Sequence, residues 1–178
     1  MNILEKEIED IVFNTASDKL RARGLFIPNL KIRQLNLGSY GISDIIAYAF
    51  YRDEFNKVQI YITVIELKKD FVDANTVMQA ARYCKGIDEL LHREFNLDNH
   101  HLHFDIVVIG KTIQLNGDFV YMAEYLNNLR AYTYSIDLEK GITFTRISDY
   151  GIVNPTIVPL EKSIKGFVKK SIKNYYNG

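Results

Sequence analysis

The stretch that decides the fold is residues 57–68, KVQIYITVIELK. Its centre is rich in β-branched and aromatic residues with little polar alternation, a pattern typical of a central strand covered on both faces. The strand ends on Glu66, Leu67 and Lys68, the only acid-x-Lys triplet in the chain. Side chains two residues apart on a strand share a face, so Glu66 and Lys68 are predicted to point the same way.

The residues before this strand predict its partner. Segment 42–52 is apolar and aromatic, and the polar turn RDEFNK separates it from segment 57–68. In an antiparallel hairpin centred on Phe55, residues whose numbers add to 110 face each other, which places Asp44 opposite Glu66. Two like charges so placed destabilise a sheet unless something compensates them, and a divalent cation would do so. An ordinary hairpin that ends in solvated charges is the alternative interpretation.

The three side chains suit one kind of chemistry. Mg²⁺ prefers oxygen ligands, takes one or two carboxylates, keeps several waters and binds substrate phosphate. Such an ion polarises a phosphate and lowers the pKa of a bound water, which gives an attacking hydroxide near neutral pH. Asp44 and Glu66 are therefore candidate metal ligands, with the ammonium of Lys68 beside them.

Further elements are predicted on either side of the hairpin. Apolar spacing predicts an amphipathic helix over about 3–22, and a first strand follows over 30–37. After the hairpin come a helix over 75–93 with an apolar stripe at Val77, Ala81 and Cys84, and a buried strand within HFDIVVIG, 103–110. A short helix over 119–126 and a hairpin of 130–137 with 142–148 are expected next, then a basic amphipathic helix over 160–175. The fold class is α/β with a mixed sheet, in one domain spanning 1–178.

Composition limits the setting and the partners. The 178 residues carry 22 basic and 22 acidic side chains, so attraction to nucleic acid must come from local charge. A single cysteine, Cys84, favours a reducing, cytoplasmic setting. We expect no signal peptide and no membrane span. The histidines of segment 99–103 match no familiar zinc spacing and are interpreted as a polar loop.

Three short motifs occur in order: Gly41-Ile-Ser-Asp44, Glu66-Leu-Lys68 and Gln79-Ala-Ala-Arg-Tyr83. Together they resemble the Gly-x-x-Asp, (Asp/Glu)-x-Lys and Gln-x-x-x-Tyr series of RecB-like nucleases in the PD-(D/E)xK superfamily. The resemblance covers about residues 3–110 and implies a restriction-endonuclease-like α-β-β-β-α-β core. It also implies that Asp44, Glu66 and the carbonyl of Leu67 ligate Mg²⁺ (or Mn²⁺) and that Lys68 orients the water or steadies the transition state. Gln79 and Tyr83 would support the site or touch the substrate.

The chain departs from that pattern in places. Ser43 replaces the proline usual before the first acid, and no histidine precedes Gly41. Glu5 of the first helix is the favoured substitute for this missing histidine, as in resolvase-like branches, although Glu7 and Glu9 are alternatives. Some members of the superfamily hold an iron–sulfur cluster with several cysteines, and a single cysteine cannot do so.

Two further sets of residues are candidate nucleic-acid contacts. Arg82 is predicted to share with Gln79 and Tyr83 a helix face that lies away from the apolar stripe. The end of the chain carries five lysines against Glu161, among them Lys165 and Lys169, which would contact phosphates and make binding salt-dependent.

The expected function is magnesium-dependent hydrolysis of phosphodiester bonds in DNA, by cleavage within a strand, with RNA left open as a substrate. One alternative is a catalytically inactive nuclease-fold module that binds nucleic acid or a protein partner. A junction-resolving homodimer is a third hypothesis.

Overall fold

The chain forms a mixed α/β fold, seen in a computed structural model that describes residues 4–115, 117–137 and 141–147. The elements are α1 (Glu5–Asn14), α2 (Ser17–Ala22), β1 (Leu30–Arg33), the 3-10 turn η1 (Gly38–Tyr40), β2 (Ile45–Arg52), β3 (Val58–Leu67), β4 (Phe71–Val72), α3 (Ala74–Glu94), β5 (His100–Gly110), β6 (Thr112–Ile113), α4 (Asp118–Tyr125), β7 (Leu129–Asp137) and β8 (Gly141–Ile147). The predicted α/β class with a mixed sheet is confirmed, while α2, η1, β4 and β6 are elements that the sequence did not predict.

Six of the strands form one mixed sheet in the order β1-β2-β3-β5-β7-β8. β2 pairs with both β1 and β3 in antiparallel fashion, β5 lies parallel to β3 and to β7, and β7 and β8 form an antiparallel pair. β4 and β6 pair separately as a short parallel ladder. β3 therefore lies inside the sheet, as its apolar sequence predicts.

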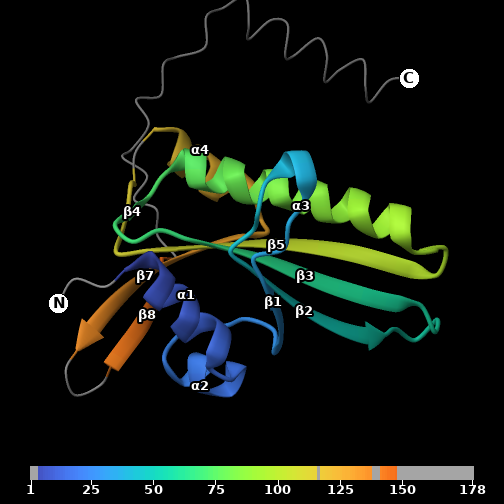
Figure 1. Cartoon of the computed structure of the whole chain (residues 1–178), viewed down its shortest axis with the longest axis horizontal. Coiled ribbons are helices and arrows are strands. Elements are labelled where there is room, and N and C mark those ends of the chain that lie inside the picture. The colour runs from blue at the N-terminus through green and yellow to red at the C-terminus, as the bar shows by residue number, and fades with distance from the viewer. Residues whose placement is uncertain (1–3, 116, 138–140, 148–178) are drawn as a thin grey trace, which may run out of the picture.

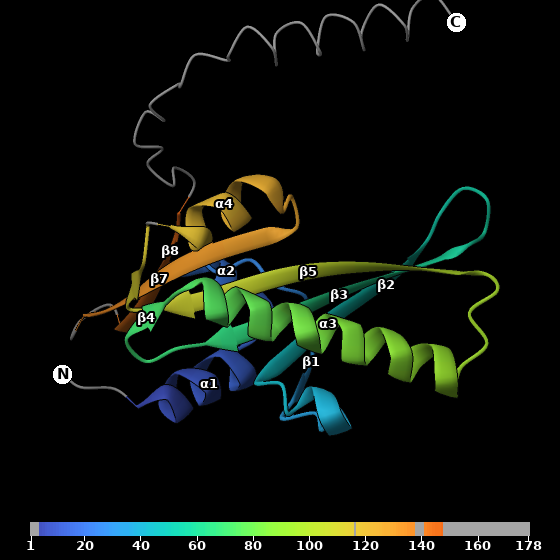
Figure 2. The same cartoon turned by 90° about the horizontal axis from the view of Figure 1, so that it is seen from above.

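Helices cover both faces of the sheet and give three layers. α3 and α4 lie on one face, while α1 and α2 lie on the other (Figures 1 and 2). Alternate residues of β3 supply the two cores, since Val64 packs with Val77 of α3 and Ile65 packs with Ile8 of α1. Glu66 has the same parity as Val64, so its side chain belongs to the face that α3 covers.

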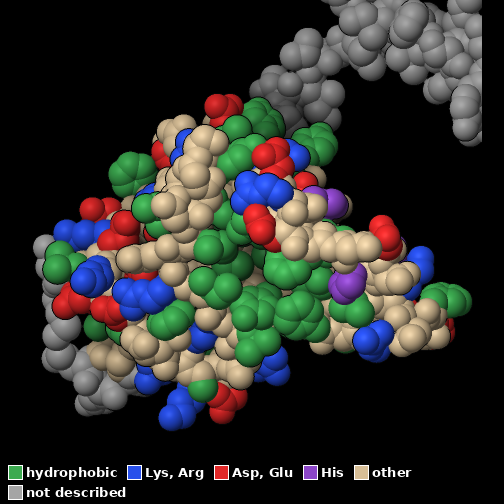
Figure 3. All heavy atoms as spheres, turned by 45° about the vertical axis from the view of Figure 1, so that its right-hand side comes forward, with side chains coloured by type: hydrophobic (Ala, Val, Ile, Leu, Met, Phe, Trp, Pro, Cys, Tyr) green, Lys and Arg blue, Asp and Glu red, His purple; other side chains and the backbone are tan. Residues whose placement is uncertain are grey.

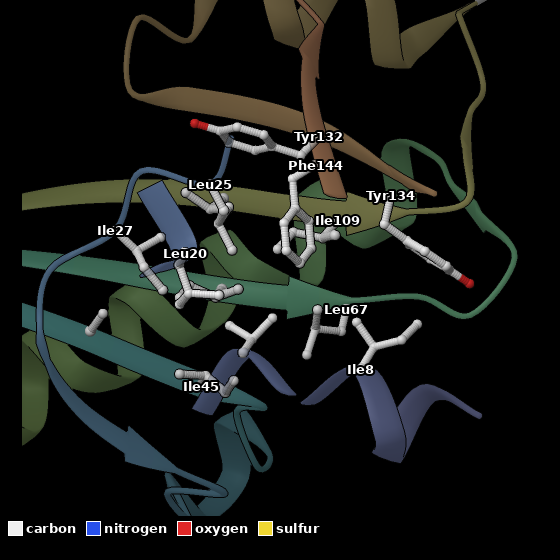
Figure 4. Close-up of a cluster of buried hydrophobic side chains, with 14 of the residues drawn as sticks. Ile8, Leu20, Leu25, Ile27, Ile45, Leu67, Ile109, Tyr132, Tyr134 and Phe144 are labelled. Atoms are coloured by element: carbon white, nitrogen blue, oxygen red, sulfur yellow. The ribbon is translucent and has the colours of Figure 1, made fainter. Parts of the chain in front are cut away.

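The core beneath α1 and α2 is made of closely packed aliphatic and aromatic side chains (Figure 4). Leu67 of β3 and Ile109 of β5 are fully buried in this core. Burial of a residue of this size stabilises the fold by about 1.5–3 kcal/mol. The backbone of β3 that carries Glu66 is therefore held firmly on the side opposite the carboxylate.

Hydrophobic side chains also remain on the surface of the part of the chain that the structure describes. Figure 3 shows apolar groups and histidines among scattered charges on the face at the β2–β3 end of the sheet. Phe50, Tyr51 and Phe55, which belong to the β2–β3 hairpin, are more than half exposed. No helix within the described ranges is long and apolar enough to cross a membrane.

Two sequence-based predictions about elements were wrong. The single helix over 3–22 is two helices, because Thr15 and Ala16 adopt extended backbone and break it. Asn14, Thr15 and Ser17 are weak helix formers, which is consistent with a break at this point. The predicted polar loop at 99–103 is instead the beginning of β5, where His100 to His103 pair with Val58 to Tyr61.

One predicted element cannot be compared with the structure. The basic helix over 160–175 lies outside the described residues, together with Lys165 and Lys169.

Candidate functional site

The β2–β3 hairpin brings Asp44 and Glu66 to the same end of the sheet, where β2 begins and β3 finishes. The pairs run from Ile45↔Ile65 to Arg52↔Val58, so the predicted register, with residue numbers adding to 110, is confirmed. Asp44 immediately precedes β2, and its Oδ2 accepts a hydrogen bond of 2.9 Å from the backbone N–H of Leu67. The carboxylate of Asp44 is thus tied to the residue directly after Glu66.

Burial and mutual repulsion both act on these two carboxyl groups. Glu66 is fully buried, and its Oε2 has no hydrogen-bond partner among the described residues. Burial and the neighbouring charge of Asp44 raise the pKa of Glu66 to about 7. Burial also raises the pKa of Asp44 to about 6, although the hydrogen bond from Leu67 opposes the increase. Both pKa values are raised chiefly because burial disfavours the charged form of each carboxyl group.

Lys68 provides the positive charge nearest to this pair. Its Nζ donates to Glu66 Oε1 at 2.7 Å and to Gln79 Oε1 at 3.4 Å. Burial lowers the pKa of Lys68, but the hydrogen bond and charge of Glu66 outweigh it and the net pKa is raised. Lys68 therefore keeps its charge at the edge of the site.

Helix α3 supports this arrangement from one side. Gln79 Nε2 donates to the hydroxyl of Tyr83 at 2.8 Å, which orients the amide oxygen of Gln79 toward Lys68. Gly41 lies against Tyr83, because a Cβ at position 41 would come within 3.1 Å of the ring. Gly41 of the first sequence motif therefore lies next to Tyr83 of the third motif, which contacts Gln79 of the same motif.

The prediction that Gln79, Arg82 and Tyr83 share an outer helix face was wrong for Tyr83. Tyr83 is only 3% exposed and packs in the core with Val77 and Ala80. Its ring has little surface to offer to nucleic acid, and its contact with Gln79 makes it a supporting residue. Arg82 is exposed and lies with its guanidinium 5.7 Å from the centre of the Tyr83 ring, beside a surface hollow that Gln79 also lines.

Helix α1 brings two glutamates to the other side of the site. Glu5 Oε2 accepts a hydrogen bond of 3.0 Å from the backbone N–H of Lys69. Glu9 is buried, and its Oε1 forms an ion pair with Nε of Arg33 at 3.3 Å. The charges of both raise the pKa of Asp44. Glu5 was the favoured residue and Glu9 one of its two alternatives, and both lie on this side of the site at the four-residue spacing of one helix face. Arg33 was not predicted, because its pairing with Glu9 depends on how β1 lies against α1.

A cavity of about 300 Å³ opens beside Lys68. Glu5 and Gln79 line it from opposite helices, together with Asp70, Phe71, Asp73 and other residues of the segment between β3 and α3. Its charged lining comes from both acids and lysines.

The donor set at this edge fits a small divalent cation with few protein ligands. No group of three or more His, Cys, Asp or Glu side chains in the described ranges is arranged to hold a metal ion. Two carboxylates are nevertheless sufficient for Mg²⁺, which completes its shell with water and phosphate oxygens. The unpartnered, buried Oε2 of Glu66 is the atom that such an ion would satisfy.

The raised pKa values predict how stability depends on pH in the absence of divalent metal. The folded protein holds protons on Asp44 and Glu66 that the unfolded chain releases near their ordinary values of 3.8 and 4.5. The stability that the protein gains from holding these two protons is complete below about pH 4. It is lost as the pH rises through the folded-state pKa values of about 6 for Asp44 and about 7 for Glu66. We expect the free energy of unfolding to fall across this window in EDTA.

Urea denaturation at a series of pH values measures this effect. Glu66→Gln removes one of the two titrating groups, so the fall between pH 5 and pH 8 should become smaller. An equal fall in the wild type and in Glu66→Gln would contradict the assignment.

Comparisons with known proteins add no relative. No family model, no curated protein and no solved structure matches the chain.

Proposed function

We propose that the protein is a metal-dependent nuclease that hydrolyses phosphodiester bonds in DNA. The observation that carries this proposal is that Glu66 pairs with Lys68, feels the charge of Asp44 and keeps one buried carboxylate oxygen without a partner among the described residues. A second support is that α1, β1, β2, β3, α3 and β5 follow one another in the order that the motif resemblance implies, with α2, η1 and β4 inserted among them.

Each residue has a distinct part in the proposed reaction. Asp44, Glu66 and the carbonyl of Leu67 would hold Mg²⁺ or Mn²⁺, which would supply charge neutralisation at the phosphate and acidify a water. Lys68 stands 2.7 Å from Glu66 and would stabilise negative charge that develops on the phosphate oxygens. Gln79, fixed by Tyr83, would position Lys68, and Glu5 would accept a hydrogen bond from water on the α1 side.

A cleavage panel tests this proposal directly. The full chain is incubated with single-stranded, duplex and four-way-junction DNA and with RNA, in Mg²⁺, Mn²⁺ or EDTA. We expect cleavage of at least one DNA form with either metal and none in EDTA. The double variant Asp44→Asn/Glu66→Gln, purified in the same way, controls for contaminating nucleases.

The second candidate is a nuclease-fold module that binds nucleic acid without chemistry. One observation favours it: Lys68 already compensates Glu66 at 2.7 Å, so the site has no absolute need of a metal ion. Binding in EDTA with no cleavage of any DNA or RNA form would support this candidate and contradict the nuclease proposal.

A further inference from the structure

Three aromatic side chains form a row on the face of the sheet opposite Glu66. Tyr51 of β2 stacks on Tyr61 of β3 with ring centres 5.4 Å apart and an angle of 18° between the ring planes. Tyr61 stacks in turn on His103 of β5 at 4.4 Å and 11°. The rings therefore stand nearly parallel across three neighbouring strands.

Hydrogen bonds hold the two outer rings in these orientations. The hydroxyl groups of Tyr51 and Tyr61 lie 3.0 Å apart. At the other end, the buried Gln59 donates from Nε2 to Asp53 at 2.8 Å, so its Oε1 is left to accept from His103 Nε2 at 2.7 Å. A buried amide and a turn carboxylate thus fix an exposed imidazole ring, so this side chain loses less conformational entropy when a ligand stacks on it.

Within the described residues, no further strand flanks either end of the row. β1 pairs with β2 only as far as Tyr48, and β7 pairs with β5 only from Ile106, so Tyr51 and His103 each have β3 on one side and no described strand on the other. The β2, β3 and β5 ends also extend past α1 and α2, which cover the other half of this face (Figure 1). Tyr51 is 52% exposed and His103 is exposed as well.

We propose that this row, the Tyr51–Tyr61–His103 platform, binds unpaired nucleobases of a single-stranded nucleic acid. A planar base would continue the stack on the outer ring face of Tyr51 or of His103. Stacking on aromatic side chains is tolerant of base identity because every base has a π-face. A duplex keeps its bases stacked inside and offers none to the platform.

The platform is separate from the Asp44–Glu66 site. Tyr61 and Glu66 are five residues apart on β3, which corresponds to about 16 Å, and they lie on opposite faces of the sheet. Binding at the platform needs neither metal nor the carboxylates. The inference therefore does not depend on the proposed nuclease activity, and a test in EDTA separates the two.

The experiment measures fluorescence anisotropy of a short labelled oligothymidylate, and of the matching oligouridylate, with the full chain in EDTA. Tyr51→Leu and His103→Leu are each expected to lower the affinity about five- to 150-fold, the range that loss of one base–aromatic stack gives. Tyr51→Phe keeps the ring and removes only the hydroxyl contact with Tyr61, so it should bind clearly more tightly than Tyr51→Leu.

Controls make the result decisive. Tyr125, which is 81% exposed on α4, provides the matched substitution Tyr125→Leu, and this variant should bind normally. Thermal unfolding of every variant verifies that the hairpin remains folded. The proposal is overturned if the wild type does not bind, if Tyr51→Leu and His103→Leu bind as tightly as Tyr125→Leu, or if they weaken duplex binding to the same extent.

Discussion

Replacement of Glu66 by Gln is expected to reduce metal-dependent cleavage by about 10²-fold or more. Glutamine keeps the shape of the side chain but removes the negative charge, and its amide hydrogens cannot ligate a cation. The loss follows from the surroundings of Glu66, which pairs with Lys68, feels the charge of Asp44 and has a buried Oε2 with no hydrogen-bond partner among the residues described. Electrostatic groups at such positions typically contribute a factor of about 10²–10³ to the rate.

Initial cleavage rates over a range of Mg²⁺ concentrations measure this effect. Glu124→Gln, a substitution of the same kind at an exposed position of α4, is the matched control and should retain full activity. Thermal unfolding with and without Mg²⁺ gives a second readout, since the cation should raise the midpoint of the wild type more than that of Glu66→Gln. Full activity of Glu66→Gln would remove Glu66 from the mechanism.

Replacement of Lys68 by Met is expected to affect both activity and stability. Cleavage should fall by about 10²–10³-fold, because Lys68 is the ammonium group that contacts Glu66 in the described part of the chain and would balance charge on the phosphate. Glu66 would also lose its ion-pair partner in a buried position, which destabilises a fold when the remaining charge is left alone. Because the Lys68 side chain is 27% exposed, a loss of about 1–3 kcal/mol is expected rather than a larger one.

The stability effect of Lys68→Met should depend on pH. With its pKa raised to about 7, Glu66 is largely protonated at pH 5 and needs no partner, so the destabilisation should be small there and larger at pH 8. Urea denaturation at the two pH values measures the difference, with the exposed Lys111→Met as control. A destabilisation of equal size at both pH values would show that lost packing, not lost charge, is responsible.

The hairpin and its register could be predicted because local sequence determines them. The polar turn between two apolar segments fixes the centre of the hairpin, and the strict two-residue alternation of strands then places Asp44 opposite Glu66. Lys68 follows from the same alternation. Gln79 was found through its motif, and its contact with Lys68 agrees with that interpretation.

Features that depend on packing between distant segments could not be predicted. Tyr83 has a polar hydroxyl and was assigned to the outer face of α3, but Gly41 and the core beneath the helix provide the space that buries its ring. Glu9 lies in a helix with several acids, and its contacts with Arg33 and Gln34 distinguish it from Glu7. Such pairings depend on how α1 docks against the sheet, which the helical period alone does not specify.

The antiparallel pairing of β2 with β3 makes the site sensitive to insertions and deletions far from it. Additional residues in the turn at Asp53–Asn56 would lengthen the loop and leave Ile45 paired with Ile65. A single residue inserted within β2 would instead carry Asp44 past Glu66 and turn its carboxylate to the α1 side. Changes of chain length should therefore be tolerated at the hairpin tip and rejected along the eight residues of β2.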